Sequence, residues 1–195
     1  MATAPVIDVA KPDQSNAVYG TLAAAFVADP VFRWIFPRAQ DYFTHFAALM
    51  ETFGGLAFEH GTAFRAADDA GAALWLPAGV HASDEELAAN WLSRMAPDQI
   101  ERVGALMGSV GDYHPSGDHW YLPTIGVDPA HQGRGVGSAL LRSTLERCDA
   151  LGLPAHLESS NRANLPLYQR FGFEIVGELQ AGDSPPLWPM TRPAQ

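Results

Sequence analysis

The sequence has little cysteine, few basic residues and no long apolar run. Its single cysteine, Cys148, excludes an internal disulfide and a cysteine-based metal cluster. The chain has 12 lysines and arginines against 22 acidic residues, a net charge of −10 that is unlike the basic stripe of a nucleic-acid-binding protein. No apolar run reaches the roughly 18 residues of a membrane span, and the first residues, MATAPVIDVAKPDQ, do not resemble a signal peptide. We therefore expect a cytoplasmic protein with no nucleic-acid or membrane partner.

What the sequence does contain is the composition of a globular protein. It has 195 residues, of which 47% are hydrophobic and 17% charged, and it shows no repeat or low-complexity linker. A chain of this length can bury a core without disulfides, so we expect residues 1–195 to form a single domain. The seven histidines are scattered and show no H-x-H or H-x-x-x-H pair, so we expect no metal site.

Hydrophobic spacing and turn residues predict a mixed order of strands and helices. The predicted strands are residues 5–10, 62–67, 71–77, 119–127, 154–159, 173–180 and 185–192, the last an edge-type strand because it contains Pro189. The predicted helices are residues 13–28, 41–54 with Asp41 as a cap, 83–110 divided at Pro97, 135–151 and 164–172, with a turn or short helix at 29–37. This order favours a mixed α/β domain.

Three glycines alternate within the stretch TIGVDPAHQGRGVGSALL, residues 124–141. They stand between an apolar strand and an amphipathic helix. A helix start offers backbone N–H groups without internal partners and a partial positive charge, which suit phosphate oxygens. Because glycine lacks a side chain, it lets the backbone approach such a ligand closely. The stretch therefore predicts a phosphate-binding helix start, with Arg134 as a nearby cation.

Two other interpretations of these glycines stand beside the phosphate site. They could form only a tight turn. They could also belong to a dinucleotide-binding fold, whose fingerprint is G-x-G-x-x-G with an acidic residue about 20 residues later. This chain has G-x-G-x-G instead, and its strand lies late in the sequence. The residues therefore fit a phosphate-binding site better than either of these two interpretations.

The motif V-D-P-x-x-Q-G-R-G-V-G resembles the acetyl-coenzyme A signature of the GNAT superfamily of N-acetyltransferases, and SSNRANLPLYQRFGFEIVGE resembles its second motif. Over nearly the whole chain the sequence is similar to puromycin N-acetyltransferase-like proteins, strongly after residue 119 and loosely between 83 and 115. The resemblance implies the GNAT fold: a mixed, mostly antiparallel sheet of about seven strands with a splayed parallel pair, flanked by helices. It also implies acetyl-CoA as cofactor and acetyl transfer to a small-molecule amine, such as an antibiotic or aminonucleoside.

The resemblance also implies where the cofactor lies. The pantetheine arm is expected beside Ile125, Gly126 and Val127, and the pyrophosphate on Gln132, Gly133, Arg134, Gly135, Val136, Gly137 and Ser138. Pro123 offers an independent reason for a break in the strand, because a proline inside a strand marks an edge or a bulge; an incidental strand end is the alternative. Gly126 would let another backbone come close. Asn161 or Asn164 could bond the cofactor arm or cap the next helix.

Acetyl transfer to an amine needs one group that gives a proton to the departing sulfur and one that takes a proton from the amine. The resemblance places Tyr168 near the sulfur, and a phenol with a pKa of about 10 stays protonated at neutral pH. Glu158 is the first candidate base, because partial burial would raise its pKa toward the working range. His119 is the second candidate, and a bound water could relay the proton instead. A packed Tyr168 and an ion-paired Glu158 are the structural alternatives.

The acceptor pocket is the least determined part of the site. An aromatic set could wall the pocket or belong to the core: Phe32, Trp34, Phe36, Tyr42, Phe43 and Phe46. Direct attack in a ternary complex is expected, since Cys148 lies on an apolar helix face and is a poor nucleophile. The rival functions are a non-catalytic acyl-CoA-binding sensor and an acetyltransferase of protein amino groups. Superfamily members are often dimers, so a homodimer is a further expectation.

Overall fold

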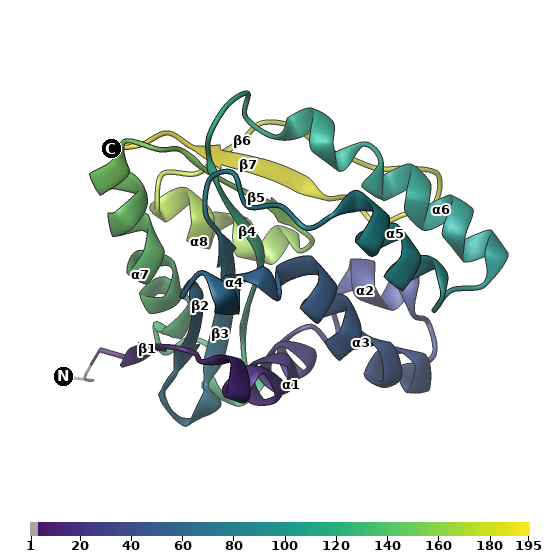
Figure 1. Cartoon of the computed structure of the whole chain (residues 1–195), viewed down its shortest axis with the longest axis horizontal. Helices are drawn as coiled ribbons and strands as arrows, with labels where there is room; N and C mark the ends of the chain where they lie inside the picture. The colour runs from purple at the N-terminus through teal and green to yellow at the C-terminus, as the bar shows by residue number, and fades with distance from the viewer. Residues whose placement is uncertain (1–3) are drawn as a thin grey trace.

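Within residues 4–195, which the computed structural model describes apart from the side chains of Asp84, Glu86, Trp91 and Leu92, seven strands form one mixed sheet (Figure 1). The strands are β1 (Ile7–Val9), β2 (Ala63–Ala66), β3 (Gly71–Leu76), β4 (Trp120–Val127), β5 (Ala155–Ser159), β6 (Glu174–Ile175) and β7 (Trp188–Arg192). Their order in the sheet is β1-β2-β3-β4-β5-β7-β6. Neighbouring strands are antiparallel, except that β4 and β5 run parallel.

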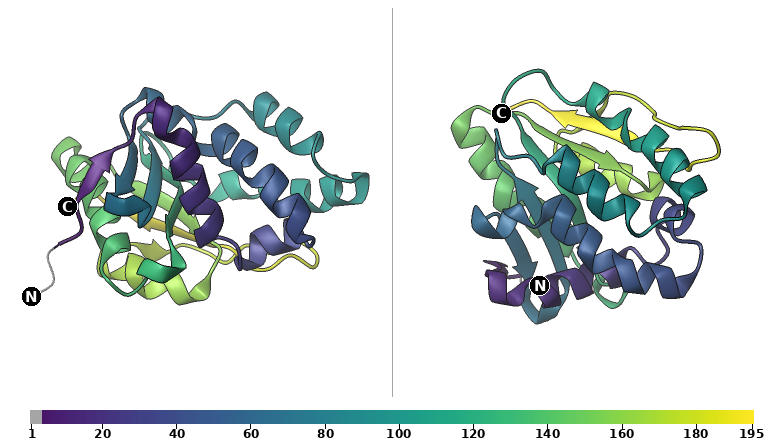
Figure 2. Two further views of the ribbon diagram at one scale, coloured as in Figure 1. Left: turned by 90° about the horizontal axis from the view of Figure 1, so that it is seen from below. Right: turned by 45° about the vertical axis from the view of Figure 1, so that its right-hand side comes forward.

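Helices cover both faces of the sheet. They are α1 (Ser15–Ala25), α2 (Pro30–Ile35), α3 (Ala39–Gly54), α4 (Leu56–Glu59), α5 (Asp84–Leu92), α6 (Pro97–Met107), α7 (Val136–Leu151) and α8 (Leu165–Arg170). Helices α1 and α3 pack on one face, and α7 and α8 pack on the other (Figures 1 and 2). Helices α5 and α6 lie beside α2 and α3, at the end of the molecule away from α7 (Figure 1). No helix among the described residues is long and apolar enough to cross a membrane.

The side chains of β3 explain why the sheet is covered on both sides. Every residue of β3 is buried. Because successive strand residues point to opposite faces, Leu74 packs in one apolar cluster with Leu22 of α1, and Trp75 packs in a second cluster with Leu140 of α7. A strand without a polar position is typical of a sheet whose two faces are both buried. The sheet therefore separates two apolar cores.

Strand β4 breaks its pairing on both sides near Pro123. On the β3 side the register shifts between Leu74 and Leu76, which marks a β-bulge. On the β5 side the paired residues of β4 are Trp120 and Tyr121, and beyond them the two parallel strands separate. The predicted bulge and the predicted splayed parallel pair in a seven-stranded sheet are confirmed.

Two local predictions were wrong. Strand β7 is not an edge strand: it lies between β5 and the two-residue strand β6. Pro189 is tolerated there because its carbonyl accepts a hydrogen bond from the N–H of Val176, just past the end of β6, so its nitrogen faces the side where β6 has ended. Asp41 does not cap α3. Arg38 occupies the cap position, and Asp41 lies in the first turn, where Arg38 binds it at 2.6 Å.

Candidate active site

The loop before α7 turns through two glycines in the left-handed region of backbone space. Gly133 has φ 73° and Gly135 has φ 83°, angles that residues with a side chain rarely adopt. Gly137 differs, because an added Cβ would make ordinary contacts, 3.4 Å from Leu167 Cδ2 and 3.6 Å from Val127 Cγ2. The turn itself therefore requires the first two glycines, whereas the packing of the chain does not require the third.

The start of α7 presents free backbone donors. Its first internal hydrogen bond joins the N–H of Ala139 to the carbonyl of Gly135 at 3.0 Å. The N–H groups of residues 136–138 precede that bond, so they have no acceptor within the helix. The side-chain amide of Gln132 donates to the carbonyl of Val127 at 3.3 Å, which ties the loop to the end of β4. Around this helix start lie the residues predicted to hold a pyrophosphate: Gln132, Gly133, Arg134, Gly135, Val136, Gly137 and Ser138.

The three β4 residues predicted to lie along the cofactor arm have different surroundings. Ile125 lines a large cavity. Gly126 faces α1, and an added Cβ would lie 2.6 Å from the Cβ of Ala25. The packing of α1 against β4 therefore accounts for a glycine at this position without any ligand. Val127 is half-buried at the end of β4, where its carbonyl holds Gln132.

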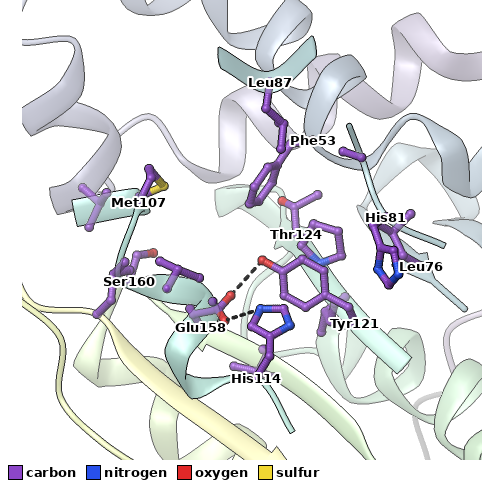
Figure 3. Close-up of a pocket in the computed structure, with 18 of the residues that line it drawn as sticks. Phe53, Leu76, His81, Leu87, Met107, His114, Tyr121, Thr124, Glu158 and Ser160 are labelled. Atoms are coloured by element: carbon purple, nitrogen blue, oxygen red, sulfur yellow. Dashed lines mark hydrogen bonds and ion pairs between the residues drawn. The ribbon is translucent and has the colours of Figure 1, made fainter. Parts of the chain in front are cut away.

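The cavity has a volume of about 750 Å³, and residues of β4 and β5 line it where these two strands separate; Figure 3 shows it in close-up. Its walls come from α2, α3, α5, α6 and strands β3 to β5, and they are largely apolar, with Phe53, Leu76 and Met107 as examples. Polar side chains gather around Tyr121 and Glu158, which point toward each other in Figure 3. The cavity therefore combines an apolar chamber with one polar centre.

Glu158 is the middle of a hydrogen-bonded cluster in this cavity. Its Oε2 accepts from the hydroxyl of Tyr121 at 2.8 Å, and its Oε1 accepts from Nε2 of His156 at 2.8 Å. Nε2 of His114 lies 3.3 Å from the same Oε1 (Figure 3). His156 is completely buried, and its Nδ1 lies 2.8 Å from the hydroxyl of Thr191. Both carboxylate oxygens of Glu158 are therefore engaged.

The surroundings of Glu158 lower its pKa, against the expectation from the sequence. Burial on its own raises the pKa of this carboxyl, but hydrogen bonds from His114 and His156 outweigh burial and bring the pKa from 4.5 down to about 2. The expected rise toward neutrality was wrong because it ignored donors that only the fold brings together. Burial and the charge of Glu158 raise the pKa of Tyr121 well above its ordinary value. At neutral pH Glu158 is therefore an anion and Tyr121 a proton-bearing donor.

Histidines that look scattered in the sequence meet in this cluster. Nδ1 of His114 lies 3.1 Å from Nε2 of His119, and Nδ1 of His119 lies 2.8 Å from the carbonyl of Gly117. The ring centroids of His114 and His156 are 4.5 Å apart. His114 was not identified from the sequence, because its place beside β5 depends on how the loop before β4 folds.

The cluster also includes ligand types that metals use. One ligand atom each from His114, His156 and Glu158 lies within 4.8 Å of the others. The Nε2 of His156, however, donates a proton to Glu158, and a nitrogen that bears a proton has no lone pair for a metal. Hydrogen bonds alone therefore account for the arrangement of these three side chains.

Tyr168 lies on α8, and its buried side chain lines the cavity. Its ring packs edge-on against Phe173, with 6.1 Å between the ring centroids. Among the described residues its hydroxyl finds no hydrogen-bond partner. Burial first, and the nearby charge of Asp29 second, raise the pKa of Tyr168 above its ordinary value. The phenol is therefore a protonated donor that is free to serve a bound molecule.

The two candidate asparagines have different environments. Asn161 caps the short 3₁₀ turn of residues 162–164, because its side-chain oxygen accepts from the N–H of Ala163 at 2.9 Å. Asn164 makes no such capping bond and lines the cavity. The sequence does not distinguish between the two asparagines, and the structure gives them separate positions.

Asp29 was missed from the sequence and lies beside the site. Its carboxylate caps α2 by accepting from the N–H groups of Val31 and Phe32, both at 3.0 Å, and it accepts from the hydroxyl of Ser160 at the end of β5. Burial raises its pKa despite these bonds. An Asp-Pro pair before an apolar helix is a recognisable capping signal, but the link to Ser160 has no local signal.

The aromatic set of the sequence analysis divides between the cavity and the core. Phe32 lines the cavity, whereas Phe36, Tyr42 and Phe46 are buried in the core. Phe43 is 61% exposed, so it belongs to neither. Much of the remaining wall comes from α5, α6 and the loop after them, which is the region where the sequence resemblance is loose.

Comparisons with known proteins agree with this geometry. The profile of the acetyltransferase (GNAT) family matches residues 59–173. An uncharacterised N-acetyltransferase of Schizosaccharomyces pombe is 30% identical over 175 residues, which cover 78% of this chain and 68% of that protein. N-alpha-acetyltransferase RimI of Mycobacterium tuberculosis is 46% identical over 54 residues, 28% of this chain and 34% of that protein.

Solved structures share the whole fold at low sequence identity. A Corynebacterium glutamicum protein described as histone acetyltransferase HPA2 and related acetyltransferase has a TM-score of 0.70 at 24% identity, over 99% of this chain and 98% of that one. An agmatine N-acetyltransferase has a TM-score of 0.68 at 15% identity, over 97% and 99% of the two chains. Arylalkylamine N-acetyltransferase 2 of Aedes aegypti has a TM-score of 0.71 at 14% identity, over 99% and 100%. With the family profile and the yeast relative, these likenesses show that this chain belongs to the acetyltransferase (GNAT) family and is an N-acetyltransferase.

Proposed function

We propose that residues 1–195 act as one acetyltransferase domain that transfers an acetyl group from acetyl-CoA to a small-molecule primary amine, by direct attack in a ternary complex. The observation that carries this proposal is the continuity between the open start of α7 and the cavity. Gly137 faces Leu167, the residue next to Tyr168, and Tyr168 lines the cavity. A molecule anchored at the helix start can therefore extend past Tyr168 into the apolar chamber.

Acetyl-CoA has the shape and charge that this path requires. Its pyrophosphate would lie on the amides of residues 132–138, because free N–H groups and the helix dipole favour anionic oxygens, and Arg134 would add a positive charge. The pantetheine arm would pair with residues 125–127 in the gap where β4 has left β5. Asn164 is better suited than Asn161 to bond the arm, because the side-chain oxygen of Asn161 already accepts a capping bond.

The proposed reaction moves two protons. The ammonium substrate first loses a proton to a base in the cluster around Glu158, and its nitrogen then attacks the thioester carbonyl carbon. The C–S bond breaks, the sulfur takes a proton from the hydroxyl of Tyr168, and the second proton of the nitrogen restores the phenol. The products are an amide, the free thiol of CoA and one proton released to solvent.

The cavity favours an amine with an apolar body. A volume of about 750 Å³ lies within the range of roughly 300–1,000 Å³ that holds a drug-sized ligand. The acidic side chains along its described walls are Asp118 and Glu158, and Glu158 is already bonded to two histidines and a tyrosine. A polycation would find few partners there. The resemblance to puromycin N-acetyltransferase-like proteins makes aminonucleosides with an aromatic group the first acceptors to test.

A second candidate is acetylation of protein amino groups, because the short match to RimI covers a named N-alpha-acetyltransferase. The walls from α2, α3, α5 and α6 enclose the acceptor side of the cavity, which favours a compact molecule over an extended peptide. A non-catalytic acyl-CoA sensor is the third candidate, and the free hydroxyl of Tyr168 favours chemistry over sensing.

Two measurements test the proposal. Calorimetry with coenzyme A should detect binding, and a Gly137→Asp variant, which places a carboxylate at the helix start, should lose that binding. Release of free thiol should then be followed with acetyl-CoA and puromycin, arylalkylamines, aminoglycosides, polyamines, amino acids and a peptide with a free N-terminus. Turnover with apolar amines and little with polyamines is expected. Absence of coenzyme A binding, or binding without turnover of any amine, would overturn the enzymatic proposal, and turnover confined to the peptide would favour the second candidate.

A further inference from the structure

We infer that His114, hydrogen-bonded to His119 and held by Glu158, is the base that takes the proton from the acceptor amine. This inference rests on the proposed function and assigns one of its steps. All three side chains line the same cavity, His114 and His119 from the loop before β4 and Glu158 from strand β5. Glu158 and His119 were the two candidates for this role from the sequence, and His114 was not among them.

Counting the protons between the two rings supports the assignment. The Nδ1 of His119 must carry a proton, because it faces the carbonyl of Gly117 at 2.8 Å and a carbonyl only accepts. A neutral His119 then has a lone pair at Nε2, which accepts a proton from Nδ1 of His114 across 3.1 Å. In that state both rings are neutral, and Nε2 of His114 is the one ring nitrogen of the pair that has neither a proton of its own nor a hydrogen bond donated to it.

The unprotonated Nε2 of His114 faces the carboxylate of Glu158. Nε2 of His114 lies 3.3 Å from Oε1 of Glu158, and two unprotonated atoms with lone pairs repel at that distance. A proton on Nε2 turns the repulsion into a charge-assisted hydrogen bond, which is the bond from His114 that lowers the pKa of Glu158. The neutral histidine pair therefore carries two ring N–H protons, and Nε2 of His114 can accept a third.

The other titratable groups of the cluster are less suited than His114 to accept the proton of the amine. His156 already donates Nε2–H to Glu158, so its Nε2 is not available as an acceptor. Tyr121 donates to the other oxygen of Glu158 and keeps its proton, because its pKa is raised. Burial and the nearby rings of His114, His156 and His81 lower the pKa of His119, which keeps that ring neutral at rest. Glu158 is a weak base, because Tyr121 and His156 already donate hydrogen bonds to its two oxygens.

The ammonium N–H bond breaks, and its proton forms a bond to Nε2 of His114, directly or through one water, so the substrate becomes a neutral amine. His114 becomes an imidazolium paired with the carboxylate of Glu158. Its Nδ1 proton can then pass along the 3.1 Å hydrogen bond to Nε2 of His119, a half-exposed ring from which solvent can remove one proton. His114 is thus the catalytic base, and Glu158 and His119 are positioning residues.

The decisive variant is His114→Gln, which keeps hydrogen-bonding atoms but cannot take up a proton. We expect kcat to fall by about 10²-fold or more, with the KM for acetyl-CoA unchanged and the acid limb of the pH–rate profile lost. In Glu158→Gln the acid limb should move to lower pH, because the anion that stabilises the protonated pair is gone. The matched control is His60→Gln, a change at an exposed histidine outside the cavity, which should alter none of these quantities.

The outcomes separate this inference from the proposed function. Full activity of His114→Gln together with loss of activity in Tyr168→Phe overturns this inference and leaves the proposed function standing. Absence of transfer by the wild-type protein overturns both. If His114→Gln does not fold, as judged by circular dichroism and coenzyme A binding, nitrogen NMR of the imidazole rings in the wild-type protein tests the assignment instead. Nε2 of His114 should lack a proton in the resting protein, and a ring that is already doubly protonated there contradicts the assignment.

Discussion

Replacing Glu158 by glutamine should remove a pH-dependent part of the free energy of unfolding. The carboxyl has a pKa of about 2 in the folded protein against 4.5 as its ordinary value. A folded pKa below the unfolded one stabilises the fold above the unfolded value, and the contribution is lost as the pH falls through the folded value. Lowering the pKa from 4.5 to about 2 adds about 3 kcal/mol to the free energy of unfolding above pH 5, of which about 2 kcal/mol disappears between pH 5 and pH 3.

Urea unfolding of wild type and Glu158→Gln at pH 5, 4 and 3 measures this contribution. Histidines of the unfolded chain do not titrate between pH 5 and pH 3, because they are already protonated below pH 5. The difference in unfolding free energy between the two proteins should shrink by about 2 kcal/mol from pH 5 to pH 3. Glu59→Gln, a change at an exposed residue, is the control, and its free energy of unfolding should change with pH as that of the wild type does. A constant difference between wild type and Glu158→Gln would refute the reasoning that the histidines hold this carboxylate ionised.

The remaining predictions concern the helix start, the proton donor and the cysteine. Tyr168→Phe should lower kcat by about 10²-fold or more in the thiol-release assay with little change in melting temperature, because the lost hydroxyl has no partner among the described residues; unimpaired turnover would remove its assignment. Gly135→Ala should cost about 1 kcal/mol of unfolding free energy because alanine disfavours positive φ, whereas Gly137→Ala should keep or slightly raise stability and still weaken coenzyme A binding in calorimetry. Equal stability losses in the two glycine variants would contradict the backbone argument. Burial raises the pKa of Cys148 to about 12, so a thiol reagent should modify it only after urea unfolds the chain, and fast modification of the native protein would show that the thiol is accessible.

Features that depend on neighbours within a few residues were predictable from the sequence. The strand, glycine loop and helix of residues 120–151 were placed correctly, because glycine, proline and helical periodicity act locally. Pro97 was expected to divide a helical region, and it begins α6. The bulge near Pro123 follows from the missing N–H of proline. These elements carry the motifs on which the family resemblance rests.

Features that depend on distant segments were not predictable in the same way. The position of β7 between β5 and β6 is a matter of sheet topology, which the strand pattern of residues 185–192 does not encode. Gly126 was assigned to a ligand, although the contact that excludes a side chain there comes from α1. The division of the aromatic set between cavity and core likewise depends on which helices pack together.

The sequence by itself determined the order of strands and helices, the glycine turn at the mouth of α7 and the presence of a tyrosine on the short helix that follows β5, since each depends on local backbone preferences. Only the tertiary structure decided the charge of Glu158 and the place of His114. The pKa of a buried carboxyl depends on the balance between desolvation and the donors around it, and here those donors are His156 on the same strand and His114 on the distant loop before β4. Chain folding sets that balance, so no local pattern in the sequence can report it.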